Sequence, residues 1–215
     1  MFNRCSSLNF LELSNFETSR VTNMTYMFSG CSLLNSLNLT NFNTSSVISM
    51  FRMFSGCSSL NSVNLSNFNA SSAKDMGKMF YKCSSLTSLD LSNFDTSNVT
   101  NMSDMFSDCS FLNYLDLSNF NTSRVISINN IFNGCTSLTY LDLFNFNVSL
   151  LSNCIFNISK NLEYVKLKGT IIGSSITFFE NCDNNPPNLT ICSDNEDFDI
   201  IFTSSKKENI NCINN

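Results

Sequence analysis

The chain has 215 residues, 42% of them hydrophobic, so it can bury a sizeable core as one or two globular domains or as one continuous stack. A formal net charge of -5, with only 12 Lys and Arg residues and no run of them, argues against a nucleic-acid partner. Without histidine, the chain cannot form a Ser/His/Asp triad or a His-ligated zinc site, and no stretch approaches the ~20 consecutive apolar residues of a transmembrane helix. Charged residues make up only 13% and form no converging carboxylate pair, so we predict a protein that is not an enzyme and uses no cofactor or metal.

The sequence is built from a repeat of 26 residues. Its clearest column consists of six cysteines, each preceded by a Phe and followed by a Leu at a distance of three residues: Cys5, Cys31, Cys57, Cys83, Cys109 and Cys135. The first residues lack the apolar run of a secretory signal and enter in the middle of a repeat, so we expect either a fragment or an incomplete beginning. A constant period of this length is typical of a solenoid, in which each unit buries its faces against its neighbours.

Each unit contains a short strand-like segment with alternating apolar and polar residues. In the first unit, Leu11 and Leu13 point to one side of the expected strand, and the residues between and after them point to the other. An Asn-Phe pair follows in all six units, beginning with Asn15 and Phe16. The Asn stands one residue earlier than in the common leucine-rich pattern LxxLxLxxN.

The second half of each unit has the spacing of one face of a helix. In the first unit, Val21, Met24, Met27, Phe28 and Cys31 fall at offsets 0, 3, 6, 7 and 10. A serine two residues before the Val column is placed to cap the start of the helix, at Ser19, Ser45, Ser71, Ser97, Ser123 and Ser149. Three of these helices would end at a left-handed glycine, at Gly30, Gly56 and Gly134.

We therefore predict an α/β solenoid of about seven coils, with a parallel sheet on one face and helices on the other. A seventh, shorter unit contains Leu162, Val165 and Leu167, so the solenoid is expected over residues 1–168. The repeat is lost at Gly169, and the helix-breaking run from Asn184 to Pro187 follows. Residues 169–215 are predicted to be a C-terminal cap or tail.

The columns resemble a known repeat family. The run from Leu89 to Phe106, LDLSNFDTSNVTNMSDMF, resembles the 26-residue repeat of the BspA-like leucine-rich-repeat surface proteins, and the resemblance covers residues 1 to about 168. It implies an extracellular or wall-displayed adhesive protein of host-associated microbes or protists.

The cysteines have two possible interpretations. The six in the repeat column lie beside Phe and Leu, so we expect free thiols packed in the core rather than a disulfide or metal ladder. Cys154 continues the apolar Met column and is expected in the core as well. For Cys182, Cys192 and Cys212 in the tail, two alternatives remain open: one disulfide that staples the tail, or free thiols.

The outward-facing strand positions differ between units, and this makes them the candidate binding surface. Serines in the middle repeats give way to Tyr114, Tyr140 and Tyr164, which are flanked by Asp116, Asp142 and Phe144. Stacked tyrosines with nearby carboxylates would form a binding patch for a protein or a glycan. The alternative is a tyrosine ladder that merely covers the sheet near the cap.

These observations predict a protein that recognises a partner. The first hypothesis is a secreted or surface-displayed adhesion protein whose sheet face contacts host proteins, glycans or cells. The alternative is an intracellular interaction scaffold, which the missing signal and the unpaired cysteines would favour. The sequence does not indicate an oligomeric state.

Overall fold

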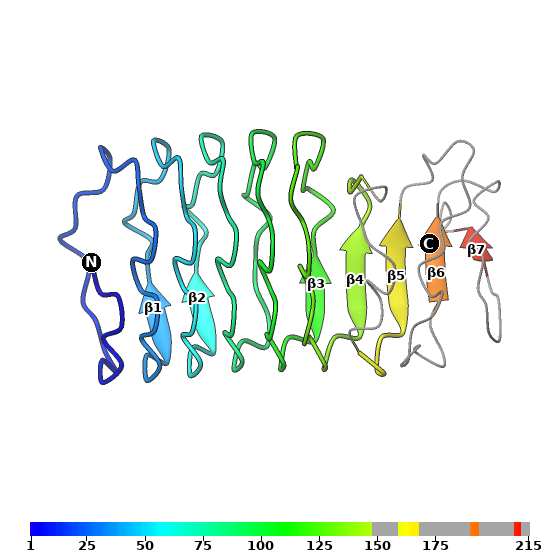
Figure 1. The fold of residues 1–215 in the computed structure, drawn as a ribbon, viewed down its shortest axis with the longest axis horizontal. Helices are drawn as coiled ribbons and strands as arrows, with labels where there is room; N and C mark the ends of the chain where they lie inside the picture. Colours follow the sequence, from blue (N-terminus) through cyan, green and yellow to red (C-terminus); the bar gives the residue numbers. More distant parts are fainter. Residues whose placement is uncertain (148–158, 168–189, 194–208, 212–215) are drawn as a thin grey trace.

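The computed structural model describes residues 1–147, 159–167, 190–193 and 209–211. Successive repeats form coils that stack side by side along the long axis, with the N-terminus at one end (Figure 1). Parallel backbone bridges join equivalent residues of neighbouring coils, from Asn23 through Ser49, Asp75 and Asn101 to Ser127. The predicted solenoid with a period of 26 residues is confirmed.

One face of the solenoid carries parallel strands, as predicted. The strands are β1 (Ser36–Asn38), β2 (Ser62–Asn64), β3 (Tyr114–Asp116), β4 (Tyr140–Leu143), β5 (Tyr164–Leu167), β6 (Thr190–Ser193) and β7 (Asn209–Asn211). β1 pairs with β2, and β3 to β7 form a second sheet in chain order. The register joins residues one repeat apart, such as Tyr114 with Tyr140.

The core consists of columns of identical side chains that stack from coil to coil. The alternation expected in the strand is confirmed, because Leu37 and Leu39 are buried while the residues on either side of Leu37 are exposed. Phe28, Phe54, Phe80, Phe106 and Phe132 are all fully buried, and the centroids of neighbouring rings lie 5.4 to 6.1 Å apart. Stacked aromatic pairs at this distance contribute beyond the area they bury.

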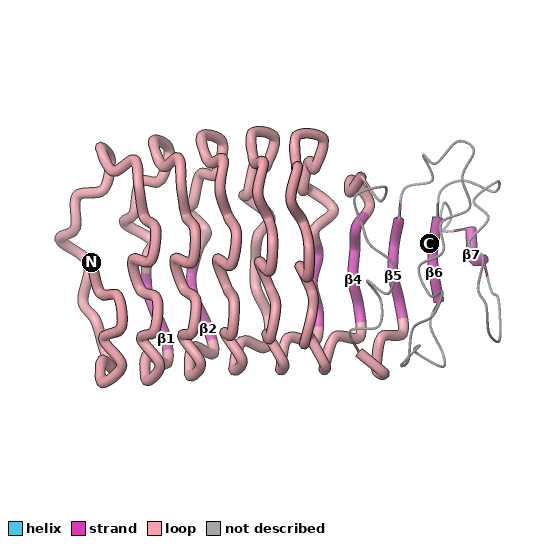
Figure 2. The backbone as a smooth tube through the Cα atoms, in the orientation of Figure 1, coloured by secondary structure: helices cyan, strands magenta, loops and turns pink. Residues whose placement is uncertain are grey.

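The predicted helices are wrong: the described residues contain no helix (Figure 2). The segment from Met102 to Cys109 is instead a series of turns, whose hydrogen bonds alternate with bonds to the next coil. Met105 N–H donates to the carbonyl of Met102, whereas Phe106 N–H donates to the carbonyl of Ile131, one coil further on. The turn face is therefore held together by hydrogen bonds between coils, like the strand face.

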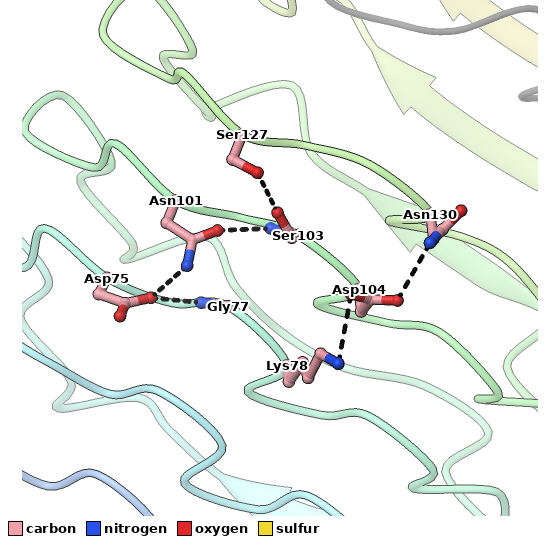
Figure 3. Close-up of polar contacts among 8 residues, drawn as sticks. All are labelled: Asp75, Gly77, Lys78, Asn101, Ser103, Asp104, Ser127 and Asn130. Carbon is pink, nitrogen blue, oxygen red and sulfur yellow. Dashed lines mark hydrogen bonds and ion pairs between the residues drawn. The ribbon is translucent and has the colours of Figure 1, made fainter.

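The apolar spacing could not distinguish these turns from a helix, because both place every third or fourth side chain on one face. The polar residues between the apolar ones decide the outcome. The carboxylate of Asp75 accepts a hydrogen bond from Gly77 N–H, and the side-chain carbonyl of Asn101 accepts one from Ser103 N–H (Figure 3). Side chains that bond to the backbone two residues on compete with the helix, and Asn, Asp and Ser have low helix propensity for this reason.

Two columns of left-handed residues recur in the turn segments of the coils. One column, with φ between 54° and 58°, contains Tyr26, Arg52, Lys78, Asp104 and Asn130. The other, with φ between 61° and 77°, contains Arg4, Gly30, Gly56, Lys82, Asp108 and Gly134. The three glycines are left-handed as predicted, but they lie in turns and do not end helices. A left-handed residue in every such turn is incompatible with a continuous right-handed helix.

The serine column does not cap helices either. Ser45 donates its backbone N–H and its hydroxyl to the side-chain carbonyl of Asn43, so the serine is the capped residue of a turn. Ser71, Ser97 and Ser123 donate their N–H groups in the same way to the residue two before them. Ser149 lies outside the described residues. These serines therefore stabilise turns and do not begin helices.

Buried threonines and exposed asparagines join the coils, and the sequence analysis did not identify the threonines. Thr44 is fully buried; its hydroxyl donates to the carbonyl of Asn69 and accepts from the N–H of Asn69, at 2.9 and 2.7 Å. Asn41 lies in the shifted Asn column and donates its amide to the carbonyls of Leu13 and Ser14 in the preceding coil. An asparagine ladder therefore exists at the exposed rim of the stack.

Two strands continue the sheet beyond residue 168. β6 pairs with β5 and β7 pairs with β6, both in parallel. The division into a solenoid over 1–168 and a cap over 169–215 stays a prediction. Cys154, Cys182 and Cys212 lie outside the described residues, so the tail disulfide is a prediction as well. In the part of the chain that the structure describes, no helix is long and apolar enough to span a bilayer.

Candidate binding site on the sheet face

The three predicted tyrosines form one continuous stack. Tyr114, Tyr140 and Tyr164 are the first residues of β3, β4 and β5, and the parallel register places them directly beside one another. The ring centroids of Tyr114 and Tyr140 lie 4.7 Å apart with planes 10° from parallel, and those of Tyr140 and Tyr164 lie 5.1 Å apart at 5°. The sheet therefore presents a ladder of three aromatic rings, which we call the tyrosine ladder.

The tyrosine ladder is partly open to solvent. Tyr114 is 46% exposed, whereas Tyr140 and Tyr164 are half-buried. Burial raises the pKa of all three phenols, and the charge of Asp142 raises it further. The hydroxyl groups thus stay protonated at neutral pH, where each can both donate and accept a hydrogen bond.

Asp142 lies two residues after Tyr140 on β4 and is only 5% exposed. One carboxylate oxygen accepts the N–H of Phe144 at 2.9 Å; the other accepts the hydroxyl of Tyr140 at 3.4 Å and lies 3.9 Å from the ammonium of Lys166. Burial raises the pKa of Asp142 despite these partners. This carboxylate therefore positions Tyr140 and Lys166, and little of it is accessible to a ligand.

The remaining predicted residues border the ladder. The ammonium of Lys166 lies 5.2 Å from the ring centroid of Phe144, so a cation covers this aromatic ring. Asp116 is half-buried, and its carboxylate accepts the N–H of Ser118 at 2.8 Å. The structure thus brings together all six predicted residues on β3, β4, β5 and the turn after β4, although Asp142 is buried.

Sequence reasoning missed Asp90, which lies one coil before Asp116 in the same column. Its carboxylate accepts the N–H and the hydroxyl of Ser92, at 3.0 and 2.7 Å, and these hydrogen bonds lower its pKa. Asn38 and Asn64 cap the equivalent turns in earlier coils. The signal was present in the repeat, because three successive units carry Asp at a position where two earlier units carry Asn.

Two hollows lie on the sheet face on the N-terminal side of the ladder, and the first of them borders Tyr114. One, of about 350 Å³, is bounded by Ser88, Asp90, Tyr114, Asp116 and Asn119, together with neighbouring residues of the same two coils. The second, of about 370 Å³, extends toward the N-terminus over β1 and β2 and is bounded by Ser36, Ser62 and Asp90. Asp90 borders both hollows, so they follow one another along the sheet.

The cysteine column has a structural role. Cys31, Cys57, Cys83, Cys109 and Cys135 are free and buried, as predicted, whereas Cys5 is free but exposed, so the expected burial is wrong for that residue. Burial raises the pKa of these five thiols, to about 12 for Cys57 and Cys135. Among the described residues, no group of three or more Cys, Asp or Glu side chains could hold a metal ion.

Comparison with known proteins identifies the repeat. The chain matches the family described as "Mycoplasma protein of unknown function, DUF285" over residues 1–89 and 88–164, which include the coils from the N-terminus to the first residue of β5. This is a family of BspA-like repeats. No curated protein and no solved structure matches the chain. The chain therefore belongs to the DUF285 family.

Proposed function

We propose that this chain is a non-catalytic binding protein, secreted or displayed on the cell surface, which presents its sheet face to a host protein, glycan or cell. The single observation that supports the proposal is the tyrosine ladder of Tyr114, Tyr140 and Tyr164. Tyrosine provides a large, rigid contact area with a polar end at low entropic cost, and such residues are enriched at interfaces.

The tyrosines are not needed to build the coil. The coils around β1 and β2 carry Ser36 and Ser62 at the same position, and their buried Leu, Met and Phe columns stack in the same way. Replacing a serine by a tyrosine therefore adds exposed aromatic surface to a unit that folds without it. Recognition of a partner would explain this exposed aromatic surface. A ladder that only covers the sheet would contribute no more than the stacking of its rings.

The proposed compartment is supported by the resemblance to BspA-like surface proteins. The unpaired thiols do not favour the intracellular alternative over it. Five of the six repeat cysteines are buried and protonated, so oxidants outside the cell would not reach them readily. Buried free thiols are therefore compatible with either compartment.

The role of the sheet face in binding is tested by substitution. The triple variant Tyr114→Ser, Tyr140→Ser and Tyr164→Ser replaces each ring by the residue that earlier coils carry, so it should keep the fold and lose binding to host cells. A matched control replaces Tyr26 and Tyr81, which lie in the turn segments, by Ser. Unchanged cell binding by the triple variant would remove the tyrosine ladder as the binding surface.

The compartment is tested on intact cells of the source organism. Brief protease treatment should release peptides of the repeats while a cytosolic marker protein stays intact. If repeat peptides appear only after lysis, the chain is not displayed at the surface, and the intracellular scaffold becomes the working hypothesis.

A further inference from the structure

The tyrosine ladder ends abruptly at Tyr114. Its ring is stacked on Tyr140 on one side, and in the described part of the chain no other ring stacks on it. On the opposite side, the equivalent position of the preceding coil is Ser88, and the hollow of about 350 Å³ lies there. The Tyr114 ring thus forms the end wall of this open hollow.

Besides Leu89 and Leu91, the rest of the lining carries several polar groups. Asp90 and Asp116 each use one carboxylate oxygen to cap a turn, and the second oxygen has no partner among the described residues. Asn119 donates its amide nitrogen to the carbonyls of Leu91, Ser92 and Phe94 in the preceding coil, which leaves its side-chain carbonyl oxygen as an acceptor, and Ser88 adds a hydroxyl to the lining. The lining therefore combines one aromatic wall with several hydrogen-bonding groups.

The second hollow extends this surface away from Tyr114, and its lining again combines apolar residues, such as Val63 and Leu65, with polar ones. Ser36, Ser62 and Ser88 occupy the same strand position in three successive coils, and the two hollows meet at Asp90. With neighbouring strands about 4.8 Å apart, the distance from Ser36 to Tyr114 is roughly 14 Å. This length accommodates a short linear chain of ligand units and exceeds what one amino-acid side chain would occupy.

We infer that this trough, closed by the ring of Tyr114, is a binding site for a neutral oligosaccharide. A sugar ring has an apolar C–H face, which stacks on an aromatic ring, and hydroxyl groups around its edge, which pair with carboxylate, amide and hydroxyl groups. An apolar peptide side chain would leave the polar lining unpaired, at a free-energy cost. Asp90 and Asp116 would repel sulfated or carboxylated sugars, so the ligand is an uncharged glycan.

This inference rests on the proposed function, because it names the ligand class of the same face. It is tested by saturation-transfer NMR with the intact chain and four neutral probes: cellotetraose, chitotetraose, maltotetraose and mannotetraose. At least one probe should receive saturation from the protein. Its affinity should be the same in about 0.1 M and about 1 M NaCl, because the contact involves no ion pair.

Two substitutions and a control locate the site. Tyr114→Ser removes the end wall and should weaken binding about tenfold, a change expected for one lost aromatic stack. Ser88→Tyr should abolish binding, because its ring would fill the hollow and cover Tyr114. Tyr81→Ser, in a turn segment outside the sheet face, should leave the affinity for the saccharide unchanged.

The outcomes separate this inference from the proposed function. If no probe binds, or if Ser88→Tyr leaves saccharide binding intact, the oligosaccharide site is excluded even when host-cell binding still depends on the tyrosine ladder. Binding that is confined to low salt, with a lysine-rich peptide preferred over every saccharide, would also overturn it. Conversely, saccharide binding that requires Tyr114 in a chain that does not bind host cells would support the site and reject the adhesion proposal.

Discussion

The thiol of Cys83 donates a hydrogen bond to the carbonyl oxygen of Phe54, with the sulfur 3.1 Å from the oxygen. The same oxygen accepts the backbone N–H of Cys57, in its own coil, at 3.1 Å. The same contact, at the same distance, joins each of the other buried cysteines to the carbonyl of the Phe in the preceding coil: Cys31, Cys57, Cys109 and Cys135. The cysteine column thus contributes a thiol hydrogen-bond ladder inside the stack.

The first prediction concerns thiol reactivity. Only a thiolate reacts rapidly with an alkylating agent, and burial holds the pKa of Cys57 and Cys135 at about 12. Iodoacetamide at about pH 8 should therefore modify Cys5 in the folded protein and leave the five buried repeat cysteines unmodified. Peptide mass mapping before and after denaturation measures this, and labelling of Cys83 in the folded chain would contradict the buried ladder.

The second prediction concerns the stability that the thiol ladder provides. Cys83→Ala removes a buried donor and leaves a small cavity, so it should lower the free energy of unfolding by about 1 to 3 kcal/mol. Cys83→Ser keeps a hydroxyl donor and should cost less than Ala. Urea denaturation compares the two, with the exposed Cys5→Ala as a control expected to change stability by less than about 0.5 kcal/mol. If Ser costs more than Ala, the thiol acts only as a small apolar group.

The third prediction concerns the left-handed column of the turns. Gly56 has φ 77°, and an added Cβ would lie 3.6 Å from the Cα of Gly30, which is an ordinary contact. Gly56→Ala should therefore lower the free energy of unfolding by about 1 to 2 kcal/mol, the cost of the left-handed conformation alone. Lys82→Gly, in the same column with φ 61°, is the reciprocal change and should stabilise the chain. Stabilisation by Gly56→Ala together with destabilisation by Lys82→Gly would contradict the left-handed conformation at these two positions.

Much of the fold could be predicted from the sequence because the repeat itself reports which residues share a column. The period of 26 residues, the inward-facing leucines and the buried Cys and Phe columns follow directly from residues such as Leu37, Phe54 and Cys57. The helices could not be predicted correctly, since offsets of three and four residues fit both a helix and consecutive turns. The evidence against a helix lay in the residues between, such as Asn101 and Ser103, whose side chains and N–H groups bond locally.

The candidate site was predictable to a similar extent. The change from Ser88 to Tyr114 at equivalent positions showed where the coils differ, and the parallel register then required the three tyrosines to stack. The sequence alone did not reveal that Asp142 is buried or that a hollow lies beside Tyr114, because both depend on the packing of side chains from neighbouring coils.

The last prediction uses the buried carboxylate of Asp142. Folding raises its pKa above the ordinary value of 3.8, mainly through burial, so the folded state holds the proton more tightly than the unfolded state. The contribution of Asp142 to stability is therefore greatest below pH 3.8 and is lost as the pH rises through the folded-state pKa. Asp142→Asn does not titrate, and Asn caps the equivalent turn at Asn38 and Asn64. The variant should gain stability relative to the native chain as the pH rises from 3.8, until the carboxyl group is fully ionised.

Urea unfolding of both proteins at a series of pH values from about 3 to about 8 measures this difference. Lys166 is the nearest cation to Asp142, and its charge opposes the rise in pKa. Lys166→Gln should therefore raise the pKa of Asp142 further. The protein would then go on losing stability, through ionisation of Asp142, up to a higher pH. A variant Asp142→Asn that instead becomes less stable than the native chain as the pH rises would mean that Lys166 and the N–H of Phe144 outweigh burial at this site.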